Sequence, residues 1–272
     1  MTLSASRPTI GVFDSGFGGL TVLKELLALV PVADYLYFGD TARLPYGSKS
    51  VETVARYAVE AAHFLEGRGA NLLVIACNTA TALALDQITR AAHVPVIGVV
   101  EPGAEQASAA SKNRRVVVIG TDATVSSHAY RKALEARGIE AREKACPLFV
   151  PLVEEGWVEH PVTEQVAQIY LKDAFADGFH DADVLVLGCT HYPLIKPLVR
   201  RIAPANVSIV DSAHSTAHAV AEKIRAQASN PSTSVASSLQ FFATDSVEKF
   251  RRMGPHFLGH PVNAVEHVDL KE

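Results

Sequence analysis

Residues 183–193 read Asp-Val-Leu-Val-Leu-Gly-Cys-Thr-His-Tyr-Pro, and this stretch indicates the fold. The four apolar residues before Gly188 are typical of a short strand buried on both faces, and the glycine lets the chain turn sharply out of the sheet. Cys189 is therefore expected at the carboxyl end of the strand. In open α/β sheets ligands bind at that edge, because the following helix N-terminus presents unpaired N–H groups there.

The same construction occurs earlier in the chain. An apolar run at residues 72–76 leads into Cys77-Asn78-Thr79. The sequence thus has two cysteines that each follow a predicted buried strand, and each is followed within two residues by a threonine. We build the functional hypothesis on these two thiols.

Strands and helices are expected to alternate along the rest of the chain. Residues 9–14 predict a strand that ends in the glycine-rich turn Asp-Ser-Gly-Phe-Gly-Gly at 14–19. A predicted strand at 207–210 also ends in Asp-Ser, which indicates two related halves. Residues 101–103 are expected to break the chain after a strand, and residues 147–157, with two prolines, are expected to form a loop.

This alternation predicts an α/β fold with two similar lobes. Each lobe would be a mostly parallel sheet flanked by helices, with the active site in the cleft between them. We expect the first lobe to comprise residues 1–98 plus 211–272 and the second to comprise residues 99–210.

Composition and charge exclude several classes of partner. Of the 272 residues, 48% are hydrophobic and 20% are charged, as in ordinary soluble domains. A net charge of −4 gives no basic surface for nucleic acid or an anionic membrane. No apolar run approaches the roughly 20 residues of a spanning helix, and the N-terminus does not resemble a signal peptide. We therefore expect a cytoplasmic protein with a small-molecule substrate; a homodimer is left open.

Three other sequence features do not indicate a catalytic, metal-binding or nucleotide-binding site. Cys146 lacks the polar neighbours of the other two cysteines, and we interpret it as a small buried hydrophobic residue. His214 and His218 lie four residues apart on a predicted helix, but no third ligand is indicated, so we expect no metal. The turn at 14–19 lacks the third glycine of a dinucleotide-binding motif.

Cys77 and Cys189 could act as a pair. A strand-end position beside a helix N-terminus favours the thiolate, which predicts a lowered pKa for both thiols. Two coupled thiols facing one cleft would be one thiolate and one thiol near the working pH. One sulfur could then remove a proton from a tetrahedral carbon while the other delivers a proton to the opposite face, which inverts the stereocentre.

Five motifs in series resemble the cofactor-independent aspartate/glutamate racemase family. They are Asp14-Ser15-Gly16 with Gly18-Gly19, Pro45-Tyr46-Gly47, Cys77-Asn78-Thr79-Ala80, Leu152-Val153-Glu154 and Gly188-Cys189-Thr190-His191-Tyr192-Pro193. The resemblance runs in order over most of the chain. It implies an isomerase that interconverts L- and D-glutamate without a cofactor and supplies D-glutamate for peptidoglycan, and hence for cell-wall biogenesis and cell shape.

The resemblance also implies roles for single residues. Cys77 would take the α-proton from the D-isomer and Cys189 would take it from the L-isomer. Asp14, Glu154 and His191 would assist the thiols.

Substrate binding would use strand-end groups. The Asp14 carboxylate suits the substrate ammonium, and backbone N–H groups and hydroxyls suit the two carboxylates. The sequence does not decide whether Glu154 or Glu155 faces the cleft, although we favour Glu154. The predicted substrate contacts are Asp14, Ser15, Tyr46, Gly47, Asn78, Thr79, Thr121, Thr190 and His191.

Two other functions stay open. Pocket length cannot be read from the motifs, so a racemase for aspartate or for a hydantoin-type substrate is one alternative. A non-catalytic amino-acid-binding module is the other, although it leaves both thiols unexplained. No lysine motif indicates a Schiff base with pyridoxal phosphate, and we expect no cofactor.

Overall fold

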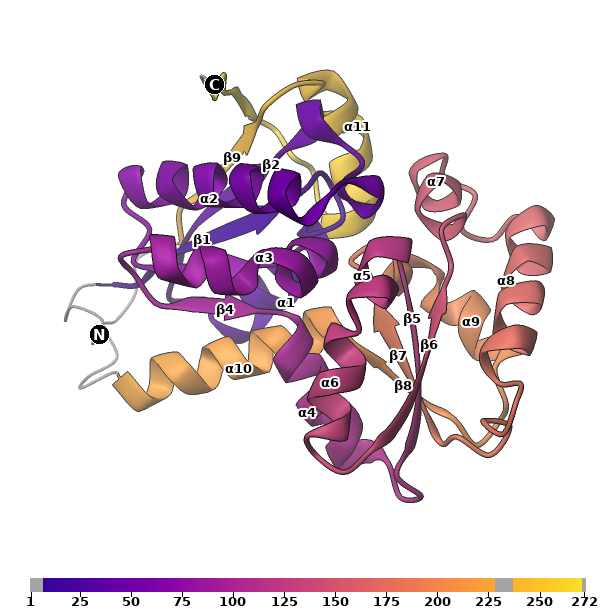
Figure 1. Cartoon of the computed structure of the whole chain (residues 1–272). Coiled ribbons are helices and arrows are strands. Elements are labelled where there is room, and N and C mark those ends of the chain that lie inside the picture. The colour runs from indigo at the N-terminus through magenta and orange to yellow at the C-terminus, as the bar shows by residue number, and fades with distance from the viewer. Residues whose placement is uncertain (1–6, 228–236, 271–272) are drawn as a thin grey trace.

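Two parallel sheets, each with helices on both faces, build the molecule (Figure 1). The computed structural model describes residues 7–227 and 237–270. The larger sheet has six strands in the order β10 (Glu266–His267), β9 (Leu239–Ala243), β2 (Asp34–Gly39), β1 (Thr9–Asp14), β3 (Leu72–Ile75) and β4 (Val96–Gly98). The smaller sheet has four strands in the order β6 (Glu140–Ala145), β5 (Arg115–Gly120), β7 (Val184–Gly188) and β8 (Ser208–Asp211). The predicted α/β fold with two parallel sheets is confirmed.

Helices alternate with these strands. The α-helices are α1 (Leu20–Leu29), α2 (Val51–Gly67), α3 (Asn78–Ala91), α4 (Val100–Ala110), α5 (Asp122–Ser127), α6 (Ala129–Glu135), α7 (Phe149–Glu154), α8 (Pro161–Ala174), α9 (Lys196–Ile202), α10 (Ser212–Gln227) and α11 (Val247–Leu258). Single 3₁₀ turns are η1 (Thr41–Arg43), η2 (Tyr46–Ser48) and η3 (Tyr192–Ile195).

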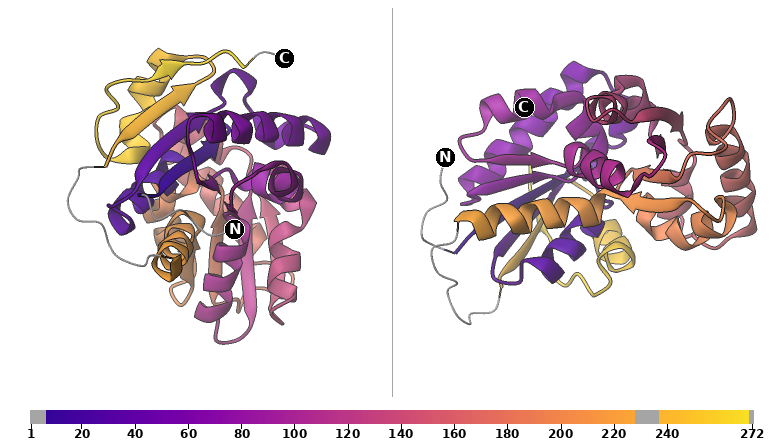
Figure 2. Two further views of the ribbon diagram at one scale, coloured as in Figure 1. Left: turned by 90° about the vertical axis from the view of Figure 1, so that its left-hand side faces the viewer. Right: turned by 90° about the horizontal axis from the view of Figure 1, so that it is seen from below.

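Each sheet buries both faces. Helices α2 and α3 pack on one face of the six-stranded sheet, and α1, α10 and α11 pack on the other. Seen from below, α10 crosses the larger sheet (Figure 2), and it contacts both α1 and α4. One hydrophobic cluster includes side chains from both sheets, such as Val12 of β1 and Leu185 of β7. The two sheets therefore share part of their core.

The two cysteine strands form as predicted. All five residues of β7 are buried, and so are all four residues of β3. Strand β7 lies between β5 and β8, so neither of its faces nor its edges meets solvent. Cys189 follows β7 directly, and Cys77 precedes α3 directly. Both cysteines therefore lie at the carboxyl ends of central strands.

Two expected breaks are helices instead. Residues 101–103 belong to the first turn of α4, and α7 occupies the segment at 147–157 that was predicted to be a loop. In each case a proline, Pro102 or Pro151, is the third residue of the helix. A proline is tolerated there because the first-turn N–H groups have no partner within the helix. The loop prediction was therefore wrong for the segment that carries Glu154.

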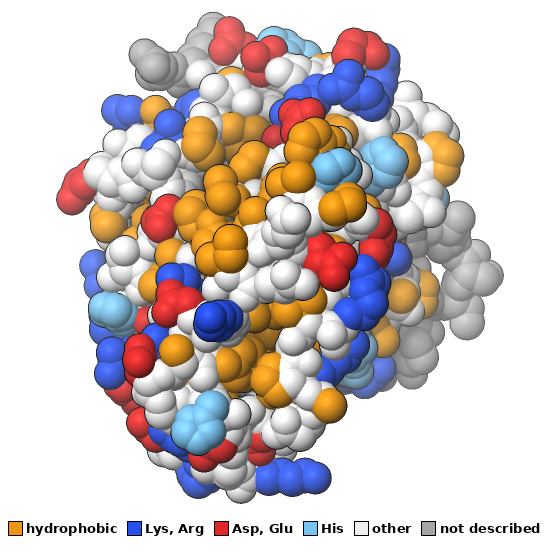
Figure 3. Space-filling model, turned by 90° about the vertical axis from the view of Figure 1, so that its right-hand side faces the viewer, with side chains coloured by type: hydrophobic (Ala, Val, Ile, Leu, Met, Phe, Trp, Pro, Cys, Tyr) orange, Lys and Arg blue, Asp and Glu red, His pale blue; other side chains and the backbone are white. Residues whose placement is uncertain are grey.

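One face of the molecule carries a broad group of apolar side chains (Figure 3). Exposed large hydrophobic residues between positions 148 and 169 are Leu148, Trp157, Val162 and Ile169.

Within the described part of the chain, no helix has the length and hydrophobicity to cross a membrane.

Candidate active site

Cys77 caps the N-terminus of α3. Its sulfur accepts a hydrogen bond from the Ala80 N–H at 3.4 Å and donates its own to the Ser15 hydroxyl at 3.5 Å. Burial and the nearby Asp14 charge together raise the pKa of Cys77 to about 12, against the lowering effect of these hydrogen bonds. The helix N-terminus is therefore placed as predicted, but the expected lowering of this thiol's pKa is wrong because burial outweighs it.

Cys189 begins a chain of three polar side chains. Its Sγ lies 3.9 Å from Nδ1 of His191, and Nε2 of His191 lies 3.2 Å from Oε1 of Glu154. Glu154 is the last residue of α7, so the turn after β7 and the end of α7 together position the histidine between the thiol and the carboxylate. Glu154, rather than Glu155, makes this contact.

The charged forms of His191 and Glu154 stabilise each other. Burial alone would lower the pKa of His191, but hydrogen bonds and charge interactions with Cys189 and Glu154 raise it to about 10. Burial likewise opposes ionisation of Glu154, but His191 and Lys249 lower its pKa to about 2. Near neutral pH the pair is therefore an imidazolium and a carboxylate. The imidazolium can hold the negative charge of a Cys189 thiolate.

Asp14 interacts electrostatically with Cys77 and with His191, the partner of Cys189. It ends β1 and is buried, its Oδ2 accepts from the Gly16 N–H at 2.8 Å, and its Oδ1 has no hydrogen bond of good geometry among the described residues. Burial raises the pKa of Asp14, against the lowering effect of His191. The same carboxylate raises the pKa of Cys77. A buried oxygen without a partner suits a cationic ligand group.

The turn after β1 touches the turn after β7. A Cβ added at Gly18 would overlap Oγ1 of Thr190 and would lie 2.5 Å from Nδ1 of His191. The Thr21 hydroxyl lies 2.9 Å from the carbonyl oxygen of Thr190. Glycine at position 18 is therefore required for the close approach of these two turns.

A second contact joins α3 to α5. Oγ1 of Thr79 lies 3.0 Å from Oγ1 of Thr121, which in turn caps α5 by accepting from the Thr124 N–H at 3.3 Å. A Cβ added at Gly47 would lie 3.3 Å from Cβ of Thr121. Three of the predicted substrate contacts, Gly47, Thr79 and Thr121, are thus brought together.

Two other predicted contacts are held by side chains that the sequence did not suggest. Asn78 accepts from the Tyr130 hydroxyl at 2.7 Å and donates to the Ser212 hydroxyl at 3.2 Å. The Tyr46 hydroxyl donates to buried Asp40 at 2.5 Å. The Tyr46 side chain therefore already has a partner, and the backbone of Tyr46 is the part available to a ligand.

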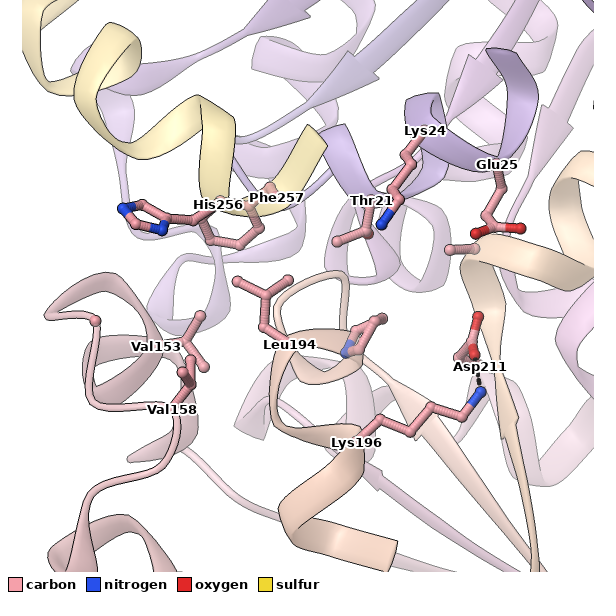
Figure 4. A pocket seen from close by; sticks show the side chains of 13 residues that line it. Thr21, Lys24, Glu25, Val153, Val158, Leu194, Lys196, Asp211, His256 and Phe257 are labelled. Carbon is pink, nitrogen blue, oxygen red and sulfur yellow. Dashed lines mark hydrogen bonds and ion pairs between the residues drawn. The ribbon is translucent and has the colours of Figure 1, made fainter. Parts of the chain in front are cut away.

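A pocket of about 480 Å³ lies behind this region (Figure 4). Its walls come from α1, α7, η3, α9, β8, α10 and α11, and they include Val153 and Phe257 but neither Cys77 nor Cys189. The Phe257 ring also meets His191 edge-on, at 5.2 Å between centroids. Within the described ranges no cluster of three or more His, Cys, Asp or Glu side chains is arranged to hold a metal.

Residues 10–220 match the Asp/Glu/Hydantoin racemase family. The chain belongs to this family. The racemase is 62% identical over 291 aligned residues to the glutamate racemase of Koribacter versatilis, covering 98% of this chain and 99% of the relative.

Solved structures of related racemases have the same fold. The glutamate racemase of Francisella tularensis, in complex with D-glutamate, superimposes with a TM-score of 0.90 at 37% identity, covering 98% of this chain and 99% of that one. The enzyme from Thermus thermophilus, in complex with beta-chloro-D-alanine, gives 0.86 at 45% identity, covering 98% and 99%. The expected family resemblance is confirmed.

Some residues of the racemase site have no local sequence signal. Tyr130 lies in the first turn of α6, and Lys249 and Phe257 lie on α11, far along the chain from the motifs. Each reaches the site only through the tertiary fold.

Proposed function

We propose that this chain interconverts L- and D-glutamate without a cofactor, by proton transfer to and from two thiols. The observation that carries the proposal is the contrast between the thiols. Burial and the charge of Asp14 favour a neutral thiol at Cys77, whereas Sγ of Cys189 lies 3.9 Å from Nδ1 of protonated His191, a cation that stabilises negative charge developing on that sulfur. In this proposal Cys189 acts as the base and Cys77 as the acid in the L-to-D direction.

The L-to-D direction uses this state directly. The Cys189 thiolate takes the α-proton of L-glutamate, forming an S–H bond and leaving the electron pair of the broken C–H bond on the α-carbon. The Cys77 thiol gives its proton to the opposite face, and its S–H electron pair stays on sulfur. The products are D-glutamate, a Cys189 thiol and a Cys77 thiolate, and the reverse reaction exchanges these roles.

Asp14 is the proposed partner of the substrate ammonium. Its buried Oδ1 is available to a cation, and its carboxylate interacts electrostatically with Cys77 and with His191, the partner of Cys189. The two substrate carboxylates would be held by Ser15, Asn78, Thr79, Thr121, Thr190 and the backbone at Tyr46 and Gly47. Strand-to-helix turns bind anions through their N–H groups, so no arginine is needed.

Glutamate is favoured over aspartate by the relatives. The Koribacter versatilis protein is named a glutamate racemase, and the Francisella tularensis structure contains D-glutamate. The ratio of kcat/KM for glutamate and aspartate separates the two substrates, and we expect glutamate to be preferred.

Three broader features are proposed alongside the activity. We place the lobe boundaries at 1–98 plus 211–272 and at 99–210, supported by the passage of the chain from β4 into α4 and from β8 into α10. We also propose a cytoplasmic location, which peptidoglycan precursor synthesis requires, and a homodimer as the assembly to test.

The deciding experiment measures inversion and α-hydrogen exchange together. Purified protein without added cofactor should racemise L-glutamate in D₂O and incorporate deuterium at the α-carbon. A Cys77→Ala, Cys189→Ala double variant should do neither, whereas a Cys146→Ala control should retain both. Full activity of the double variant would refute the mechanism, and tight glutamate binding without exchange in the wild type would favour a binding module.

A further inference from the structure

Lys249 reaches the Glu154 carboxylate from another part of the molecule. Its Nζ lies 2.9 Å from Oε2 of Glu154, across 95 residues of sequence. Lys249 lies in the first turn of α11, which covers the six-stranded sheet, whereas Glu154 ends α7 beside the four-stranded sheet. This ion pair therefore joins the two parts of the molecule next to the reacting groups.

The two oxygens of Glu154 have different partners. Oε2 meets Lys249, and Oε1 meets Nε2 of His191 at 3.2 Å. A carboxylate held at both oxygens has a fixed plane, so the Lys249 contact determines where Oε1 points. His191 in turn lies 3.9 Å from the sulfur of Cys189. Lys249 is thus the fourth member of a chain that ends at a proposed base.

Helix stability does not explain a lysine at this position. The N-terminal turn of a helix carries a partial positive charge, so a cation there is locally unfavourable. The side chain is instead placed by contacts outside α11. Its Nζ lies 5.2 Å from the centroid of the buried Phe17 ring, in addition to the contact with Glu154. Only 39% of the lysine side chain is exposed, which limits solvent screening of the pair.

We propose that Lys249 is a positioning residue for the racemase reaction, which fixes Glu154 so that Oε1 faces His191. The link to catalysis rests on the proposed two-thiol function. Without the ammonium group, the Glu154 side chain is free to turn toward water. His191 then loses its carboxylate partner and holds the charge on Cys189 less well.

The test compares Lys249→Met, Lys249→Arg and Arg251→Met. Methionine keeps the apolar stem and removes the charge, and arginine restores a cation. Among the described residues, Arg251 forms a surface pair with Glu248 on the same helix. We expect Lys249→Met to lower kcat about tenfold, a part of the 10²- to 10⁴-fold effect of positioned proton transfer, with little change in KM. Lys249→Arg should recover most of kcat, and Arg251→Met should match the wild type.

The second readout is the titration of His191 by NMR, with its signal identified by its absence in His191→Asn. We expect Lys249→Met to lower the titration midpoint of His191, because the Glu154 carboxylate has moved away. An unchanged or raised midpoint would overturn the proposal, even if kcat fell, because Glu154 would then hold its place unaided. The titration needs no substrate, so it still tests Lys249 if the wild type proves unable to racemise or exchange glutamate.

Discussion

The hydroxyl of Thr79 lies 3.0 Å from the hydroxyl of Thr121, and this contact joins the N-terminus of α3 to the N-terminus of α5. Thr121→Ala removes this contact and a helix cap, so we expect a loss of about 0.5–2 kcal/mol in the free energy of unfolding. Because Thr121 is a proposed substrate contact, KM should also rise about twofold to tenfold, the equivalent of one hydrogen bond.

Ser50→Ala is the matched control for this prediction. Ser50 caps α2 by accepting from the Thr53 N–H at 3.3 Å, at an exposed position. The control should lose stability by a similar amount but keep the wild-type KM. Denaturant unfolding and steady-state kinetics measure the two quantities, and an equal KM in both variants would remove Thr121 from the substrate site.

Gly18→Ala should damage both stability and activity. The added methyl group would overlap the side chains of Thr190 and His191, and overpacking of this kind costs about 1–3 kcal/mol. Because His191 itself must shift, kcat should fall as well. Gly67→Ala is the control, because a Cβ at position 67 meets nothing within 4 Å. Replacing a helical glycine with alanine should raise the free energy of unfolding by about 0.5–1 kcal/mol. Wild-type kcat in Gly18→Ala would contradict the tight contact between the two turns.

His191 should make stability depend on pH in the alkaline range. Its pKa rises from 6.5 to about 10 on folding, because its thiol and carboxylate partners outweigh burial. The histidine therefore binds a proton more tightly in the folded state, and its stabilising contribution is complete below pH 6.5 and is lost as pH rises through about 10. The difference in unfolding free energy between wild type and His191→Asn should shrink over this window. A constant difference would mean that His191 is not paired as described.

Glutamate should protect two of the three cysteines from alkylation. Cys77 and Cys189 are each 5% exposed beside the proposed substrate contacts, whereas Cys146 is 0% exposed and sits in the core. Iodoacetamide labelling followed by peptide mass spectrometry should show slower modification of Cys77 and Cys189 when glutamate is present. Labelling of Cys146 should be slow with or without substrate. Failure of glutamate to protect would place the thiols outside the substrate site.

The local pattern of the sequence predicted the strands and the positions of both cysteines. Continuous apolar runs define β3 and β7 because both faces of these strands are covered, and this property is visible in a few residues. The helices α4 and α7 were missed for an equally local reason, since a proline in a first turn looks like a break.

The electrostatics of the site depend on tertiary structure and could not be predicted in the same way. The helix N-terminus at Cys77 is visible in the sequence, but the burial that raises its pKa is not. The family motifs implied that Glu154 and His191 assist the thiols, but the pairing of these two residues needed the geometry of α7. Lys249 approaches from α11 and has no motif of its own, so only the folded chain reveals its contact.

The chain has a single tryptophan, and its place in the fold gives this molecule an intrinsic optical reporter. Trp157 stands three residues after Glu154, partly exposed, with its ring stacked on His160 at 4.5 Å between centroids. Any movement of the α7 segment changes the surroundings of this one indole. Emission spectra recorded during a glutamate titration therefore report on the segment that directly follows Glu154, without an attached dye or an engineered label.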